Sequence, residues 1–329
     1  MAGKNIVNFL ELKNPHERDA RIHFDEPTHT YRVDNNIVGI SVSGLVHAAF
    51  PQFDANSVVE NSYKSWASEK RSPYFRLIHH MRILMHMDDH AIKREIINQW
   101  QSIGTERASA GTSVHLSAEM FLNNAPREDK SPEFQQFLNW YNKDKPKTWE
   151  PYRTEWSVFH EDADLAGQID GLFYDPIDKS YHMVDWKCVE KLETHNSFGE
   201  RGFKPFQKLP NTNLNHYYVQ QNLYAWILRE KYGIDVKSMS LLKIHHTNDM
   251  DTAVLYKVHD LRKEVDDYMH ERIQVVAASC VHTSKKRKAW TTEEIESNEH
   301  KIKYYKELIA SLEEENSRAR RYMADESEP

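Results

Sequence analysis

Cysteine is scarce in this sequence: Cys188 and Cys280 are the two cysteines among 329 residues. Two thiols cannot build a disulfide framework, a four-cysteine zinc site or a four-cysteine iron–sulfur cluster within one chain. The sequence also lacks an apolar run of the roughly 18 residues that a transmembrane helix needs. Residues 1–14 contain no apolar signal-peptide core. We therefore expect an intracellular protein, of undetermined compartment, that is neither secreted nor embedded in a membrane.

Positive charge is not in excess, and the glycine motifs of nucleotide-binding loops are missing. The chain has 43 Lys and Arg against 50 Asp and Glu, which gives a net charge of −7. This excludes a globally basic polyanion binder, although a basic groove on an acidic body stays possible. Neither G-x-x-x-x-G-K nor G-x-G-x-x-G occurs, so we expect no nucleotide cofactor. The length allows a full hydrophobic core.

Hydrophobic spacing divides the chain into three parts. Residues 1–104 combine a predicted β-hairpin, 29–33 against 37–42, with helical spacings that begin near residue 54. Residues 105–280 mix predicted strands with helices; the strands are 153–159, 165–174, 181–189, 238–245 and 253–258, and the helices are 134–141, 216–232 and 261–277. Residues 281–329 read as a basic linker and a charged helical tail, with 304–321 helical. We predict an α/β fold: a central mixed β-sheet flanked by helices, with a helical N-terminal extension packed on the core and a charged C-terminal helix.

The most informative segment is a predicted antiparallel hairpin between the second and third of these strands. The residues from Asp175 to Ser180 are typical of a turn. If Asp175 pairs with Ser180, the same register places Asp170 directly opposite Asp185. Like charges that face each other destabilise a sheet, so such a pair needs solvent or a cation between its members.

The residues that follow Asp185 add a third charge to this surface. Side chains alternate along a strand, so Lys187 shares a face with Asp185 while Trp186 points to the other side, toward the core. Two carboxylates suit a hard divalent cation such as Mg²⁺. A nearby lysine can stabilise charge or position or deprotonate water. The alternative is an ion-pair patch on an exposed hairpin, because the Asp-x-Lys triplet is common.

Three further positions carry groups that are weak signals alone. His115 and Glu119 lie four residues apart on one helix face, where a structural histidine is the competing interpretation. Glu155 lies on the first predicted strand, where a solvent-facing carboxylate is common. Gln220 shares a largely apolar helix face with Tyr224, so it needs a polar partner, either in a site or in a loop.

The order of these groups resembles a known family. The chain contains, in this order, Gly-Thr-x-x-His at 111–115, Glu155, Gly-x-x-Asp-Gly at 167–171, Asp-Trp-Lys at 185–187 and Gln-x-x-x-Tyr at 220–224. This series resembles the motifs of the PD-(D/E)XK nuclease superfamily. More narrowly the series is similar to its RecB-like exonuclease branch, to which mitochondrial and CRISPR-associated exonucleases belong, and the lead-in around Tyr31 resembles viral and organellar members. The resemblance covers about residues 105–275 and implies a restriction-endonuclease-like core. The proline of the family name is absent, since Ile169 precedes Asp170, and two cysteines disfavour the iron–sulfur subgroup.

The resemblance also implies a role for each group. The metal ligands would be His115, Asp170, Asp185 and the backbone carbonyl of Trp186, around one or two Mg²⁺ or Mn²⁺ ions. Lys187 would activate or orient the attacking water. Glu155 would contact the site or a second metal, and Gln220 and Tyr224 would bind substrate phosphate or brace the site. The expected catalytic set is therefore Lys187, Asp170, Asp185 and Glu155.

The implied function is a metal-dependent deoxyribonuclease that hydrolyses phosphodiester bonds. The family branch favours an exonuclease that acts on DNA ends or single strands in replication, repair or recombination. The candidate DNA contacts are Arg201, Lys204 and Lys208, which are interleaved with phenylalanines in the loop after Lys187. The competing interpretation, of equal weight, is that the aromatics only anchor this long loop to the core. Two other classes stay open: a non-catalytic nucleic-acid-binding protein that retains the fold, and an assembly protein that acts through the charged tail. Protein partners are not readable from the sequence.

Overall fold

The computed structural model describes residues 9–125, 128–248, 253–286, 303 and 306. The chain divides into two compact units, Met1–Gln274 and Val275–Pro329. The predicted tail helix at 304–321 and the part of the basic run beyond residue 286 lie outside the described residues. Within the described ranges, no helix has an apolar stretch long enough to cross a membrane.

A mixed six-stranded sheet forms the centre of the first unit and confirms the predicted α/β class. Its strands are β4 (Ile40–Ser41), β5 (Glu150–His160), β6 (Leu165–Asp175), β7 (Ser180–Lys187), β8 (Val236–Lys243) and β9 (Val254–Lys257). Strands β5, β6 and β7 form an antiparallel meander, β8 lies parallel to β7, and β9 returns antiparallel to β8. The short strand β4 pairs in parallel with the start of β6.

The register of the β6–β7 hairpin agrees with the prediction. Asp175 pairs with Ser180, and the ladder continues as far as Gly171 opposite Val184. Trp186 points into the core and is fully buried, as expected. Its indole lies so close to Gly171 that a Cβ on that glycine would come within 2.3 Å of the ring. The glycine in the Asp-Gly pair is therefore required for the tryptophan to pack.

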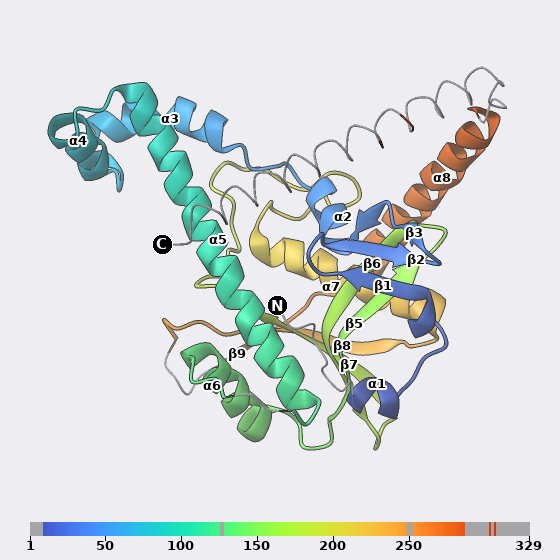
Figure 1. The fold of residues 1–329 in the computed structure, drawn as a ribbon. Helices are drawn as coiled ribbons and strands as arrows, with labels where there is room; N and C mark the ends of the chain where they lie inside the picture. Colours follow the sequence, from blue (N-terminus) through green and yellow to red (C-terminus); the bar gives the residue numbers. More distant parts are fainter. Residues whose placement is uncertain (1–8, 126–127, 249–252, 287–302, 304–305, 307–329) are drawn as a thin grey trace, which may run out of the picture. The chain divides into compact units, whose positions relative to one another are not determined.

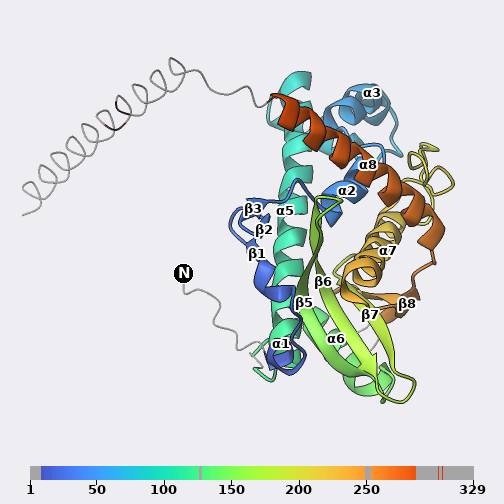
Figure 2. The same ribbon diagram turned by 90° about the vertical axis from the view of Figure 1, so that its right-hand side faces the viewer.

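Helices cover both faces of the sheet (Figure 2). One face packs against α2 (Val42–Ala48), α7 (Asn213–Tyr232) and the first turns of α8 (Arg262–Lys286). The other face packs against the second half of α5 (Asp89–Leu122), against α6 (Pro132–Asn139) and against the π-helical turn Trp140–Asp144. Alternate residues of a strand serve the two cores: Met183 belongs to the first, Val184 to the second.

Local signals explain where two of these helices begin and end. The sequence predicted a strand through residue 42, but the strand ends at Ser41, whose Oγ accepts a hydrogen bond from the Gly44 backbone N at 3.0 Å. This cap starts α2 at Val42. Thr212 caps α7 in the same way, and Gly233, with φ 66°, ends it as predicted.

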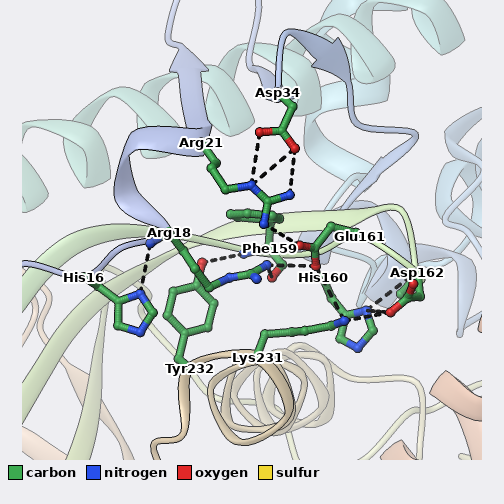
Figure 3. A network of polar contacts seen from close by, with 11 residues as sticks. His16, Arg18, Arg21, Asp34, Phe159, His160, Glu161, Asp162, Lys231 and Tyr232 are labelled. Carbon is green, nitrogen blue, oxygen red and sulfur yellow. Dashed lines mark hydrogen bonds and ion pairs between the residues drawn. The ribbon is translucent and has the colours of Figure 1, made fainter.

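The N-terminal segment forms a small element of its own beside the sheet. It comprises α1 (Phe9–Lys13), the 3₁₀ turn Asp19–Arg21 and a three-stranded antiparallel sheet of β1 (Ile22–Asp25), β2 (Thr30–Val33) and β3 (Asn36–Ile37). The predicted hairpin is thus confirmed, though its second strand is shorter. Charged groups fasten the segment to the main sheet, as Figure 3 shows: Arg18 and Arg21 each pair with Glu161 at 2.8 Å, next to Phe159 and Lys231.

A helical arm extends away from the sheet along α5. It consists of α3 (Ala55–Ser68), α4 (Phe75–Leu84) and the first half of α5, and Figure 1 places α3 and α4 at the end of α5 far from the sheet. The arm has a separate small core of Val59, Tyr63, Ile78, Met81, Ile92 and Ile96. Because α5 is one helix through residue 122, the predicted boundary between residues 104 and 105 falls inside it.

Candidate functional site

Three side chains from separate elements meet at the centre of the sheet. His115 comes from α5, Glu155 from β5 and Asp170 from β6, and each has a potential metal-ligating atom within 4.8 Å of those of the other two. His115 Nδ1 lies 3.2 Å from Glu155 Oε1, and its Nε2 lies 3.7 Å from Asp170 Oδ2. The same Nε2 lies 3.0 Å from the carbonyl oxygen of Trp186. We call His115, Glu155 and Asp170 the central cluster.

The backbone is strained where Glu155 joins this cluster. Thr154 pairs with Gly171 and Trp156 with Ile169, a register that places Glu155 across from Asp170. Glu155 has φ 45°, in the left-handed region that a side chain with a Cβ rarely adopts. Such strain persists only where surrounding contacts hold it, and it concentrates at functional sites.

Neighbouring side chains supply those contacts. Gln168 Nε2 donates to the Glu155 carbonyl at 2.9 Å, and Thr154 Oγ1 donates to the Asp170 carbonyl at 2.8 Å. The Asp170 carboxylate itself accepts a hydrogen bond from the Trp186 backbone N at 3.1 Å. Side chains and a carboxylate therefore satisfy backbone groups at the point where the ladder of β5, β6 and β7 is interrupted.

A buried ion pair lies beside the central cluster, on β7. Lys187 Nζ is 2.8 Å from Asp185 Oδ2, and both side chains are largely buried. Gln221 Nε2 donates to Asp185 Oδ1 at 2.9 Å, and Lys187 Nζ donates to Gln220 Oε1 at 3.4 Å. The ammonium also lies 4.6 Å from the centre of the Tyr217 ring. Helix α7 thus surrounds the ion pair with one tyrosine and two glutamines.

These pairings explain how the fold accommodates two carboxylates near each other. The hairpin ladder ends at Gly171 and Val184, one residue short of Asp170 and Asp185, so the predicted direct pairing of the two aspartates stays a prediction. Each carboxylate has its own cationic partner, His115 for Asp170 and Lys187 for Asp185. Asp185 is not among the three residues of the central cluster, so its predicted role as a metal ligand stays a prediction.

Burial and charge shift the pKa values of these groups strongly. Burial lowers the pKa of His115, but the carboxylates of Asp170 and Glu155 outweigh it and raise the pKa to about 9. Burial raises the pKa of Asp170, against the charges of His115 and Lys187. Burial and the charge of Asp170 raise the pKa of Asp185. Despite burial, the charges of Asp185 and Asp170 raise the pKa of Lys187, which stays protonated near neutral pH.

A cavity of about 910 Å³ opens next to the central cluster. Its walls come from α5, β5 and the N-terminal β1–β2 hairpin, and they include His115, Glu155, Tyr31 and Tyr224. Six carboxylate side chains line it: Glu11, Asp19, Asp25, Glu26, Glu119 and Glu155. Arg153 also lines it, but its guanidinium is paired with Asp19 at 2.7 Å. The cavity is therefore acidic and attracts cations rather than phosphates.

The two tyrosines fix the inner wall of this cavity. Tyr224 is buried against Gly167, where an added Cβ would come within 2.7 Å of its ring, which explains the glycine in the Gly-x-x-Asp motif. Burial, followed by the charges of Glu155 and Asp170, raises the pKa of Tyr31. Burial also raises the pKa of Tyr224, so both phenols stay protonated at neutral pH.

The predicted DNA-contact residues lie apart from this cavity. Arg201, Lys204 and Lys208 are exposed on the loop that precedes α7, and none of the three lines the cavity. Arg201 Nη1 donates to the Lys208 carbonyl at 2.9 Å, which braces the loop. Phe206 is fully buried and anchors the loop, whereas Phe198 is 75% exposed. Anchoring therefore explains one of the loop aromatics.

The structure brings most of the predicted site residues together. His115, Glu155, Asp170 and the Trp186 carbonyl form one group, and Lys187, Asp185 and Gln220 form the adjacent one. Sequence reasoning missed Gln221, Tyr217 and Tyr31. A signal for Tyr217 existed, because it lies three and seven residues before Gln220 and Tyr224 and so shares their helix face.

A second group of metal-compatible side chains lies at the opposite end of the β6–β7 hairpin. Asp175, Asp178 and His182 have potential ligand atoms within 4.8 Å of one another. Protein groups already occupy these atoms: Thr148 Oγ1 donates to Asp175 at 2.6 Å, and Lys237 pairs with Asp178. We interpret this group as a structural support of the turn.

A scan against protein-family models and a search of curated proteins both find no match to this chain.

Proposed function

We propose that this protein is a metal-dependent DNA nuclease with a restriction-endonuclease-like core of the PD-(D/E)XK type. The observation that carries the proposal is the central cluster together with the Lys187–Asp185 pair. These residues lie close together although they are up to 72 positions apart in the sequence, from His115 to Lys187. Their order along the chain, and the helix and strands that carry them, are those expected from the family resemblance. An ion-pair patch on an exposed hairpin does not account for this convergence. Asp170 and Asp185 are buried, the other groups are half-buried, and together they come from three strands and a helix.

The donor set suits Mg²⁺ or Mn²⁺. His115, Glu155 and Asp170 offer one imidazole nitrogen and two carboxylate groups, and the Trp186 carbonyl oxygen adds a further hard donor. The acidic cavity beside them concentrates cations from solution. A divalent ion held there would polarise a phosphoryl oxygen and lower the pKa of a water molecule.

Lys187 supplies a fixed positive charge in this proposal. Its ammonium lies between Asp185 Oδ2, Gln220 Oε1 and the Tyr217 ring, so its direction is set by three contacts. Because its pKa is raised, it serves as a donor that orients water and stabilises developing negative charge, rather than as a general base.

The proposed substrate preference follows from the size of the cavity beside the site. A cavity of about 910 Å³ does not admit a duplex, whose major groove alone is about 12 Å wide. We therefore propose single strands or frayed ends as the substrate, with Gln220 and the Tyr224 hydroxyl bracing the scissile phosphate. The exonucleolytic mode rests on the family resemblance.

The test is a digestion assay on four DNA substrates. Single-stranded and double-stranded DNA, each linear and circular, is incubated with Mg²⁺, Mn²⁺ or EDTA; the linear forms are end-labelled and the circles are labelled internally. We expect cleavage of linear single strands with either metal, and loss of cleavage with EDTA or in Asp170→Asn. Asp144→Asn, a change of an exposed carboxylate away from the site, serves as the matched control. Near wild-type cleavage by Asp170→Asn would contradict the site assignment, and cleavage of circles would contradict the exonuclease mode.

A further inference from the structure

The turn between α3 and α4, together with α4 itself, carries an unusual concentration of positive charge; we call Lys70, Arg71 and Arg76, at the turn and in the first turn of α4, the cationic turn. From Lys70 to Met87 the chain contains no acidic residue, whereas it has four cationic side chains and three histidines. The cations are Lys70, Arg71, Arg76 and Arg82. The whole chain has a net charge of −7, so this stretch is opposite in sign to the rest of the molecule.

Three of these four cations have no carboxylate partner within the described part of the chain. Arg82 is paired with Asp89 at 2.7 Å. Lys70, Arg71 and Arg76 are exposed and take part in no ion pair among the described residues. Elsewhere in this unit Arg21 is paired with Asp34 and Arg262 with Asp235, whereas the exposed Arg32, Arg94 and Arg201 are spread singly over other elements and have no ion pair among the described residues. An unpaired cluster on one turn is therefore free to meet an external polyanion.

Aromatic side chains lie beside this turn. Tyr74, between Arg71 and Arg76, accepts a hydrogen bond from Trp100 Nε1 at 2.9 Å and stacks on Trp66 with 4.4 Å between ring centres. Phe53 lies 5.7 Å from the Trp100 ring and is 71% exposed. Unpaired cations next to an exposed aromatic ring are the combination that holds a single-stranded polynucleotide by phosphate contacts and base stacking.

We infer that this cationic turn is a second polynucleotide-binding surface, distinct from the central cluster, which grips a single strand whose end lies at the site; the inference rests on the proposed function. The hydrogen bond from Trp100 fixes the turn at that level of α5. His115 is fifteen residues further along the same helix, about 22 Å at 1.5 Å per residue. At the 3.4 Å spacing of a helical strand, that distance corresponds to about six or seven nucleotides.

The test compares a long and a short oligonucleotide on one triple variant. Lys70→Ala, Arg71→Ala and Arg76→Ala are combined in the Asp170→Asn background for binding and in the active protein for cleavage. For a 20-nucleotide single strand we expect Kd to rise at least tenfold, and the salt slope to flatten by roughly 2, or 0.7 per lost contact. Cleavage of a tetranucleotide, which spans only roughly 14 Å at that spacing, should stay at the wild-type rate.

Two further variants separate charge from folding. Lys70→Arg, Arg71→Lys and Arg76→Lys together keep the charge and should retain the wild-type Kd. Lys147→Ala, Lys257→Ala and Lys263→Ala remove three exposed cations elsewhere and should leave Kd unchanged. The inference is overturned if the turn variant binds the long strand as wild type does, or if tetranucleotide cleavage falls equally. If the wild-type protein neither binds nor cleaves DNA, the proposed function fails as well.

Discussion

Glu155 is the residue at which backbone and chemistry conflict most directly. Its φ of 45° belongs to the region that favours glycine, yet its carboxylate lies 3.2 Å from His115. A left-handed conformation costs a residue with a Cβ about 1–2 kcal/mol. A position that retains a side chain at this cost is better explained by the role of its carboxylate than by the stability of the strand.

Substitution of Glu155 by glycine or by alanine separates the cost of the backbone conformation from the role of the carboxylate. Both Glu155→Gly and Glu155→Ala remove the carboxylate, but glycine alone relieves the backbone. We expect Glu155→Gly to be more stable than Glu155→Ala by about 1 kcal/mol, while both lose most of the cleavage activity. Urea unfolding measures the first quantity and the digestion assay the second. Equal stability of the two variants would show that the backbone at 155 carries no strain.

Substitutions at Lys187 and Asp185 measure how much a buried ion pair contributes to the free energy of unfolding. Lys187→Met alone leaves Asp185 buried without its cation, and we expect a loss of about 3–5 kcal/mol. The double variant Asp185→Asn, Lys187→Met keeps an acceptor oxygen for Gln221 Nε2 and removes both charges. It should regain a large part of that loss while it stays inactive. A double-mutant cycle by urea unfolding gives the coupling, and additive effects would argue against a direct pair.

At the scale of elements, α5 joins the arm to the sheet through a stretch without support. Residues 101–106 are all exposed, and nothing lies within 4 Å of a Cβ built on Gly104. A glycine inside a helix costs about 0.5–1 kcal/mol relative to alanine. The sequence tolerates this cost in a stretch of α5 whose described residues belong to neither the core of the arm nor that of the sheet.

Alanine at Gly104 is therefore a stabilising change. We expect Gly104→Ala to raise the free energy of unfolding by about 0.5–1 kcal/mol, measured by urea denaturation. Gly233→Ala is the opposite case, because Gly233 ends α7 with φ 66° and an alanine there is strained. It should lower stability by about 1 kcal/mol. A destabilising Gly104→Ala would show that the helix must bend at this point.

Among the helices and strands, some features of the site could be predicted from the sequence and others could not. The turn residues at 175–180 and the period of two gave the hairpin register and the common face of Asp185 and Lys187, because both depend on local geometry. The choice between Gln220 and Gln221 could not be read, since α7 is buried on nearly all sides and its apolar pattern defines no single face. Tyr31 was unpredictable as a site residue because its place depends on docking of the N-terminal sheet.

At the scale of the whole molecule, buried neutral histidines make stability depend on pH. Burial, and then the charge of Lys231, lowers the pKa of His160 to about 4. Its Nδ1 accepts a hydrogen bond from the Ala163 backbone N at 3.3 Å, and its ring stacks on Trp226. The unfolded chain binds a proton at this residue below pH 6.5, whereas the folded chain does not until about pH 4. Stability contributed by His160 is therefore present above pH 6.5 and lost as the pH falls toward 4.

His160→Phe should remove this dependence. The shift corresponds to about 3 kcal/mol between pH 6.5 and 4, so the variant should show a flatter slope of stability over that range even if it is less stable at pH 7. Trp226→Phe weakens the stacking but keeps the histidine, and it should keep the slope. Urea unfolding at a series of pH values measures both. An unchanged slope in His160→Phe would assign the acid sensitivity to other groups.

The unbroken run of α5 from Trp100 to His115 also sets a rotational phase between the arm and the sheet. Each residue inserted in the exposed stretch would turn the arm by about 100° and move it by 1.5 Å. Two inserted residues would aim the α3–α4 turn at the opposite side of the helix, whereas seven would return it to nearly the same side, about 10 Å further out. The length of this helix therefore sets both the distance and the direction of the arm relative to the sheet. We expect insertions or deletions in it to be tolerated in steps of whole turns.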